Sequence, residues 1–217
     1  MDKRIAEKFF YEKRVYKILR YIAYGFISFG IFSYIFLWSG VEIGTPFLVV
    51  GIVIFWLVRS KTVSGKDYLF QAESVINEEI INLQNELSIK EKQNGSVITS
   101  KQFVVSPDFC VKKAAKNTLV SNCAQTVVMY CNDKINRFHI LATTFDFVGG
   151  TKEETDISGS LSKLQLIRKE IKHTQFGFTQ KQLSINLVHE DKQFVFVFTD
   201  DYPTNKFIDD YFTNRRL

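Results

Sequence analysis

An apolar run of 38 residues, residues 21–58, constrains the fold of this chain more than any other feature. It carries one charged residue, Glu42, within the segment WSGVEIGTPF (38–47), which also holds two glycines and a proline. A membrane-spanning helix needs roughly 17 to 25 predominantly apolar residues, so the run is too long for one crossing. Division at Glu42 leaves arms of 21 residues (21–41) and 16 residues (43–58).

The position of Glu42 favours two spans over one. A carboxylate in the middle of a bilayer costs several kcal/mol, whereas one in a turn at the water boundary costs little. We therefore predict a transmembrane hairpin with Glu42 in its turn and Trp38 at an interfacial position. Arg59 and Lys61 can extend to the head groups and compensate for the shorter second arm. The alternative is a buried hairpin of a globular protein, for which the sequence offers no obvious covering layer.

Basic residues flank the apolar run, and the turn has none. Three follow the run: Arg59, Lys61 and Lys66. Seven precede it, in a basic N-terminal segment of residues 1–20: Lys3, Arg4, Lys8, Lys13, Arg14, Lys17 and Arg20. The positive-inside rule then predicts both termini in the bacterial cytoplasm or the mitochondrial matrix, with Glu42 on the opposite side.

Residues 61–217 hold 20 basic and 19 acidic residues, and this near-neutrality argues against a nucleic acid as the main partner. No phosphate-binding loop, nucleophile elbow or HExxH motif occurs. We therefore expect a non-enzymatic protein without cofactor, metal or small-molecule substrate. Three unpatterned cysteines are expected to be reduced thiols. A zinc site of Cys123, Cys131 and His139 is a weaker alternative, because each also fits an ordinary strand.

A helix is predicted within residues 64–93, with Ser64 as its N-cap. Apolar residues recur along it every three or four positions: Leu69, Ala72, Ile76, Ile80, Leu83 and Leu87. Two interpretations stay open. The stripe packs on its own domain, or it contacts a partner through Leu69, Ile76, Ile80, Leu83 and Leu87.

Residues 96–217 change to a strand pattern. Segments rich in β-branched and aromatic residues cover 96–106, 125–131, 137–147, 176–180, 183–188 and 193–200. The last of these is apolar on both faces, which predicts a central strand. Pro203 marks the start of a closing helix. The predicted fold class is an α+β membrane protein, with a two-helix transmembrane hairpin followed by an antiparallel β-rich domain and a C-terminal helix.

The first span contains small residues that let a neighbouring helix approach closely: Gly25, Ser28, Gly30 and Ser33. We interpret them as candidate contacts to a partner in the membrane. Ordinary membrane-helix composition, in which glycine is common, is the competing interpretation. The spans hold no ionisable residue except Glu42, so they offer no ion path.

The order of these features resembles a family. A basic aromatic segment, FFYEKRVYKILRY, leads into the hairpin, and VVMYCNDKINRFHILATT is followed by a Gly-Gly loop and DISGSLSKLQL. The chain closes with QFVFVFTDDYPTNKFIDDYFTNRRL. This is similar to the small two-span mitochondrial inner-membrane proteins that help assemble respiratory-chain complexes and ATP synthase, most of all the cytochrome oxidase-associated branch.

The resemblance covers 1–60 and 120–217 and leaves 61–120 as an insertion. It implies an accessory subunit or assembly factor with a matrix-facing domain, whose partners are the lipid bilayer and other subunits of a respiratory complex. Two alternatives remain, both in a bacterial plasma membrane. One is a sensor whose cytoplasmic β-barrel binds a ligand such as a cyclic nucleotide, and the other is a pleckstrin-like interaction module.

Overall fold

The computed structural model describes residues 1–12, 14–36, 40–91, 95–106, 108–115, 118–163, 165–175, 178–189 and 192–213. It confirms the α+β class, with helices first, then antiparallel sheets and a C-terminal helix. The chain divides into two compact units, which are described separately. One unit is residues 4–68, and the other combines residues 1–3 with residues 69–217.

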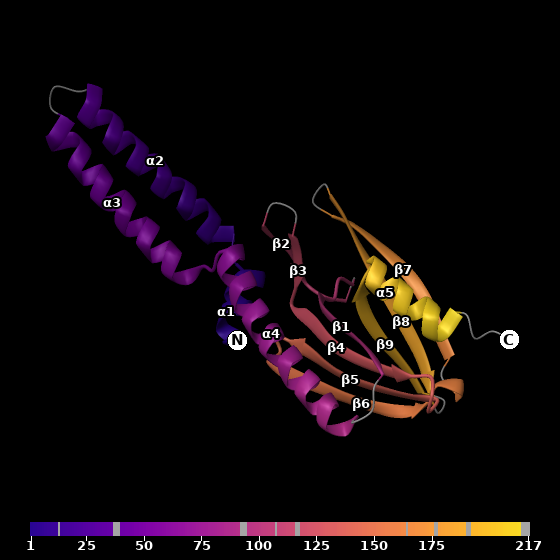
Figure 1. Ribbon diagram of the computed structural model, residues 1–217. Coiled ribbons are helices and arrows are strands. Elements are labelled where there is room, and N and C mark those ends of the chain that lie inside the picture. Colours follow the sequence, from indigo (N-terminus) through magenta and orange to yellow (C-terminus); the bar gives the residue numbers. More distant parts are fainter. Residues whose placement is uncertain are drawn as a thin grey trace. The chain divides into compact units, whose positions relative to one another are not determined.

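The first unit contains α1 (Lys3–Phe10) and an antiparallel hairpin of α2 (Arg14–Phe36) and α3 (Gly40–Lys61) (Figure 1). The predicted turn around Glu42 is corrected, because this residue lies in the first turn of α3. There the positive end of the helix dipole favours a carboxylate. Pro46 lies inside the helix, where it removes one hydrogen bond close to the helix start. Trp38 lies outside the described residues.

Helix α4 (Gly65–Lys90) confirms the predicted helix. The Ser64 side chain caps its start, since its Oγ accepts a hydrogen bond from the backbone N–H of Asp67 at 3.1 Å. Beyond α4 the second unit has two antiparallel sheets. The larger has the order β1 (Ser96–Phe103), β4 (Cys123–Asn132), β5 (Arg137–Asp146) and β6 (Thr151–Ser160). The smaller has the order β7 (Gln165–Gln175), β8 (Phe178–His189) and β9 (Lys192–Thr199).

Three shorter elements complete this unit. A hairpin of β2 (Val111–Ala115) and β3 (Thr118–Ser121) lies in the chain between β1 and β4, and a 3-10 turn, Leu161–Lys163, follows β6. Helix α5 (Tyr202–Ile208) continues into a π-helical turn, Asp209–Thr213. Asp201 caps α5 by accepting a hydrogen bond from the N–H of Thr204. The predicted C-terminal helix is therefore confirmed.

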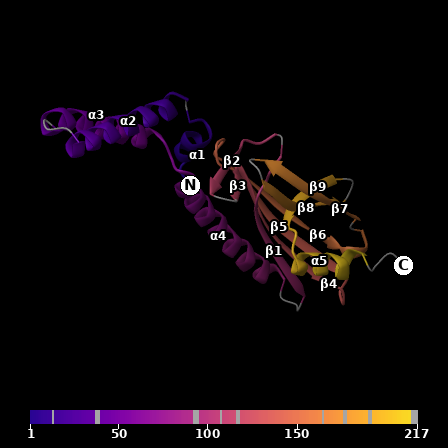
Figure 2. The ribbon, with the colours of Figure 1, turned by 90° about the horizontal axis from the view of Figure 1, so that it is seen from above.

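The two sheets pack face to face, and α4 covers the outer face of the larger sheet (Figures 1 and 2). Alternation along β4 produces these layers, because successive strand side chains point to opposite faces. Val127 and Met129 join the core between the sheets, whereas Val128 and Tyr130 pack against α4. With both faces covered, all ten residues of β4 are buried.

Strand β9 lies at the edge of its sheet, so the predicted central position is wrong. Side chains of the other sheet satisfy its outer backbone edge instead. Gln125 accepts from the N–H of Val197 at 2.8 Å and donates to the carbonyl of Val195 at 3.2 Å. Ser100 donates to the carbonyl of Val197 at 2.9 Å. Residues 176–180 and 183–188 were expected as two strands, and the described part from Phe178 onward is one strand, β8.

Candidate functional site

The four small residues predicted to contact a partner divide between two faces of α2. Gly25 and Ser28 are exposed, whereas Gly30 and Ser33 are buried. A Cβ atom at Gly30 would lie 2.6 Å from Cγ of Leu48, so the missing side chain lets α2 and α3 approach. Gly30 and Ser33 therefore serve the hairpin itself, and only Gly25 and Ser28 remain on its outer surface.

The base of the hairpin is held by Arg20. Its Nη2 donates to Oε1 of Glu12 and to the hydroxyl of Thr62, both at 3.0 Å. This guanidinium therefore links the start of α2 to the segment that follows α3. Arg59 and Lys61, the other predicted flanking residues, are exposed in the last turn of α3.

The apolar stripe of α4 packs on its own domain. The contact consists of Ile80, Leu83 and Leu87 from α4 and of Val128, Leu141 and Tyr130 from β4 and β5. Leu69 and Ile76, nearer the start of α4, line a cavity of about 280 Å³ together with Phe103 and Leu119. The stripe therefore packs on its own domain at Ile80, Leu83 and Leu87, in agreement with the first of the two interpretations.

Polar groups flank this apolar contact at both ends. Glu79, Leu83, Leu87 and Glu91 recur every four residues, so they form one row along α4. The opposing row on β5 takes every second residue, His139, Leu141 and Thr143. Both rows read polar, apolar, polar, and this match fixes the position of the helix along the strand.

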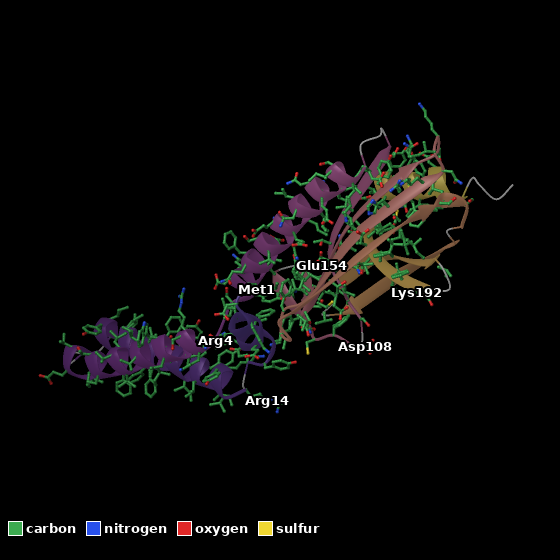
Figure 3. The ribbon with its side chains drawn as sticks, turned by 90° about the horizontal axis from the view of Figure 1, so that it is seen from below. Met1, Arg4, Arg14, Asp108, Glu154 and Lys192 are labelled. Atoms are coloured by element: carbon green, nitrogen blue, oxygen red, sulfur yellow. The ribbon has the colours of Figure 1, made fainter. Side chains whose placement is uncertain are left out.

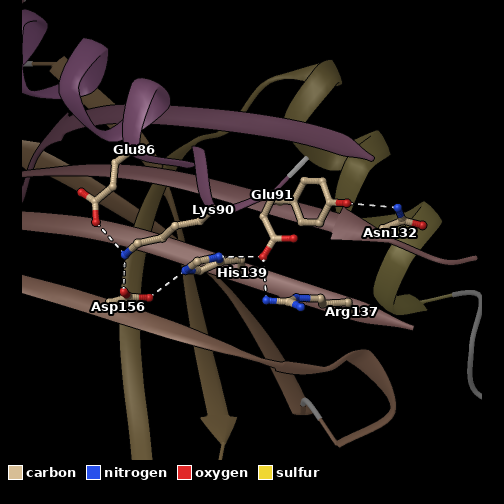
Figure 4. Close-up of polar contacts among 8 residues, drawn as sticks. Glu86, Lys90, Glu91, Asn132, Arg137, His139 and Asp156 are labelled. Atoms are coloured by element: carbon tan, nitrogen blue, oxygen red, sulfur yellow. Dashed lines mark hydrogen bonds and ion pairs between the residues drawn. The ribbon is translucent and has the colours of Figure 1, made fainter. Parts of the chain in front are cut away.

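His139 is the centre of the larger polar end (Figure 4). Its side chain is 5% exposed and lies between two carboxylates. Nδ1 lies 2.9 Å from Oε1 of Glu91, and Nε2 lies 2.7 Å from Oδ1 of Asp156. Arg137 also donates to Oε1 of Glu91, at 3.0 Å. Both ring nitrogens can donate at once only when the imidazole carries two protons.

Lys90 extends the cluster to the surface. Its Nζ lies 2.6 Å from a carboxylate oxygen of Asp156 and 2.6 Å from one of Glu86. Hydrogen bonds to Asp156 and Glu86 raise the pKa of Lys90. Burial opposes ionisation of Asp156, but hydrogen bonds from Lys90 and His139 outweigh it and lower the pKa of that carboxyl group. Lys90 and Asp156 are therefore both held in their charged forms.

Glu79 forms the second polar end. It accepts a hydrogen bond from the hydroxyl of Thr143 at 2.7 Å and pairs with Lys152 at 3.1 Å. The hydrogen bond that Lys152 donates to Glu154 is the main cause that raises the pKa of Lys152, and its hydrogen bond to Glu79 adds to it. Two charged contacts about three helical turns apart thus fasten α4 to the sheet.

A cavity of about 370 Å³ opens beside the His139 cluster. Its lining combines an apolar floor with amide, hydroxyl and carboxylate groups: Gln84, Leu87, Ser88, Glu91, Gly95, Val97 and Tyr130. The volume falls within the range of small-molecule pockets. Glu91 already accepts from His139 and Arg137, so its position in this lining is fixed by the cluster.

The side chains of the His139 cluster bond to one another. Both nitrogens of His139 already face carboxylates, so neither is placed to take a proton from a substrate. Over the described ranges, no group of three His, Cys, Asp or Glu side chains is arranged to hold a metal ion. Cys123 and Cys131 lie at opposite ends of β4, about 26 Å apart at the usual rise per residue, which contradicts a shared zinc site.

Sequence reasoning did not identify Glu91, His139 or Asp156 as a group. Glu91 directly follows α4, whereas His139 lies in β5 and Asp156 in β6, at separations of 48 and 17 residues. The available signal was the four-residue spacing that places Glu79 and Glu91 on the row of the buried leucines.

No protein-family model matches the chain, and neither a curated protein nor a solved structure matches it significantly.

Proposed function

We propose that this chain is a non-enzymatic membrane-anchored binding protein, in which α2 and α3 cross the bilayer and residues 69–217 bind a partner. The surface of the hairpin carries this proposal. Both helices are long and apolar enough to span a membrane, and only 17% of each apolar window is buried. A core helix of a soluble protein is mostly buried, so lipid is the solvent that suits these surfaces.

The His139 cluster supports binding rather than catalysis. Its carboxylates and imidazole are bonded to one another, and they stabilise the packing of α4 on the sheet. A rigid connection of this kind suits a domain that must hold a surface in a fixed form.

Two kinds of partner are proposed. The family resemblance favours a respiratory-chain complex, above all cytochrome c oxidase, with the protein in the mitochondrial inner membrane and both termini in the matrix. However, the segment 61–120 supplies α4 and β1, and β1 pairs with β4 along eight residues. The family resemblance treats this segment as an insertion. The alternative is a pleckstrin-like module in a bacterial plasma membrane, with cytoplasmic termini, in which α4 and β1 are part of the domain itself. Two packed sheets with a C-terminal helix favour this second form.

Labelling of cysteines in sealed membrane vesicles tests the anchor. In a background where Cys110 is replaced by serine, Asp2→Cys and Glu42→Cys should react with an impermeant maleimide from opposite sides. Both positions lie outside the apolar helix interiors, so reaction requires only access to water. Equal access to both positions would exclude the hairpin topology.

Native gels of solubilised membranes followed by mass spectrometry distinguish the partners. Stoichiometric migration with a respiratory complex supports the accessory-subunit form. Migration away from every such complex supports the interaction module. Turnover of a substrate by the purified protein alone would contradict the non-enzymatic proposal in both forms.

A further inference from the structure

One end of the hairpin carries an unbalanced group of cations. Within residues 4–68 and apart from Glu42 at the opposite end, nine Lys or Arg residues face three Asp or Glu residues, a net charge of +6. Five of these cations define what we call the cationic collar: Arg14, Lys17, Arg59, Lys61 and Lys66. All five are exposed, and none forms an ion pair within the part of the chain that the structure describes.

Two of the three acidic residues are already engaged, and the third, Glu7, is exposed on α1. Glu12 pairs with Arg20, which also bonds to Thr62. Asp67 accepts a hydrogen bond from the Ser64 hydroxyl at 2.7 Å. The remaining excess of positive charge can be balanced by anions from outside the chain.

Its position along the hairpin indicates the source of those anions. The apolar residues begin at Tyr21 and end at Val58, so Lys17 lies about 6 Å and Arg14 about 10 Å beyond that boundary at 1.5 Å per residue. Two exposed aromatic side chains lie near the ends of the apolar run. Tyr21 (76% exposed) is its first residue, and Trp56 (68% exposed) lies two residues before its last. Aromatic rings with basic residues just outside them are typical of the head-group region. Figure 3 shows Arg14 at this end, where the carbon-rich surface of α2 begins.

Helix α1 does not supply an alternative membrane contact through its aromatic residues. Phe9 and Phe10 are buried, and both rings pack on Tyr68, with centroid distances of 4.6 and 5.1 Å. Its apolar face is therefore used inside the unit. The exposed basic side chains remain as the groups that can interact with the membrane surface.

We propose that the cationic collar binds the head groups of anionic phospholipids. This inference rests on the proposed membrane insertion and adds a lipid class to it. A basic residue close to an anionic membrane surface strengthens attraction about fivefold. At the helical rise per residue, Lys17, Arg59 and Lys61 lie within one Debye length, about 8–10 Å, of the ends of the apolar run.

Fluorescence quenching of Trp56 by brominated lipids tests the proposal on the full-length chain. Trp38→Phe leaves Trp56 as the single tryptophan, next to the collar. The protein is reconstituted in phosphatidylcholine vesicles containing 30% phosphatidylglycerol, with bromine on one lipid or the other. We expect brominated phosphatidylglycerol to quench about fivefold more per mole than brominated phosphatidylcholine.

Two matched triple variants separate the collar from general charge. The first variant combines Lys17→Gln, Arg59→Gln and Lys61→Gln. It should reduce the ratio of quenching by brominated phosphatidylglycerol to quenching by brominated phosphatidylcholine to within twofold of one. The control replaces three exposed lysines of the β domain, Lys134, Lys192 and Lys206, by glutamine and should leave the preference intact.

Each remaining outcome has a defined meaning. Quenching without head-group preference overturns the lipid proposal and leaves insertion standing, whereas no quenching by either lipid overturns insertion itself. Equal loss in the control triple variant, or displacement by 10 mM soluble glycerol phosphate, would show that the collar is not a lipid surface.

Discussion

The replacement Glu91→Gln should loosen the C-terminal half of α4 and leave its apolar contact in place. The Glu91 side chain is 5% exposed and accepts from His139 and from Arg137. A hydrogen bond to a charged group contributes about 1.5–3 kcal/mol, and the bond from His139 to the Glu91 carboxylate is buried, because the His139 side chain is also 5% exposed. The Arg137 side chain is 48% exposed, and its share is at most about 1 kcal/mol because water replaces the contact.

A neutral amide keeps one acceptor, so the net cost of this change is about 2 kcal/mol. That free energy corresponds to roughly a 30-fold increase in the population of states with α4 open. This population is measured by the hydrogen-exchange rates of the backbone amides of residues 79–91, in the full-length protein in detergent micelles. The matched control is Glu86→Gln on the same helix, whose side chain is 49% exposed and pairs only at the surface. Glu86→Gln should change the exchange rates of these amides by about twofold or less. Exchange in Glu91→Gln within twofold of the unchanged protein would refute the assigned role of this carboxylate.

Three further results are expected. Iodoacetamide should modify exposed Cys110 quickly at neutral pH and spare Cys123, because burial raises the pKa of the Cys123 thiol to about 12. Rapid alkylation of Cys123 in the folded protein would contradict its buried position. Gly30→Ile should lower the melting temperature of the helical circular dichroism signal by several degrees, while Gly25→Ile, whose Cβ meets nothing within 4 Å, should not. Burial disfavours the charge of Asp156, but bonds from the lysine of α4 and the histidine of β5 lower its pKa below 3.8, so its stabilisation is present above that pH and lost below it. Asp156→Asn should therefore flatten the fall in denaturation midpoint between about pH 5 and pH 2, and an unchanged acid profile would exclude this contribution.

The sequence predicts the helices and the strongest strands because their patterns are local. The predicted helix within residues 64–93 is α4, which spans Gly65–Lys90. Its stripe predicted a contact through Leu83 and Leu87, but periodicity cannot tell a sheet of the same chain from a partner. That choice depends on β4 and β5, whose outward faces supply Val128, Tyr130 and Leu141 to this contact.

Strand β6 was not predicted, because it lacks the usual apolar alternation. Ile157 is its only fully buried position. Its outward positions carry Lys152, Glu154 and Asp156, of which Lys152 and Asp156 pair with charges on α4. Their role appears only after α4 has packed on the sheet. The same dependence explains why the His139 cluster was invisible, since its members meet through the tertiary fold alone.

The carboxamide of Gln125 occupies the place that a neighbouring peptide group would take beside β9. An open strand edge is a template on which a second copy of a chain can add, and it is most dangerous in a strand as hydrophobic as QFVFVFT. By bonding both an N–H and a carbonyl of that edge, Gln125 prevents addition of another strand at its centre. Gln125→Leu would keep the side-chain volume but remove both of these bonds and leave the bond from Ser100 to the Val197 carbonyl, so resistance to fibril formation at high concentration is shared between two polar side chains of the opposite sheet.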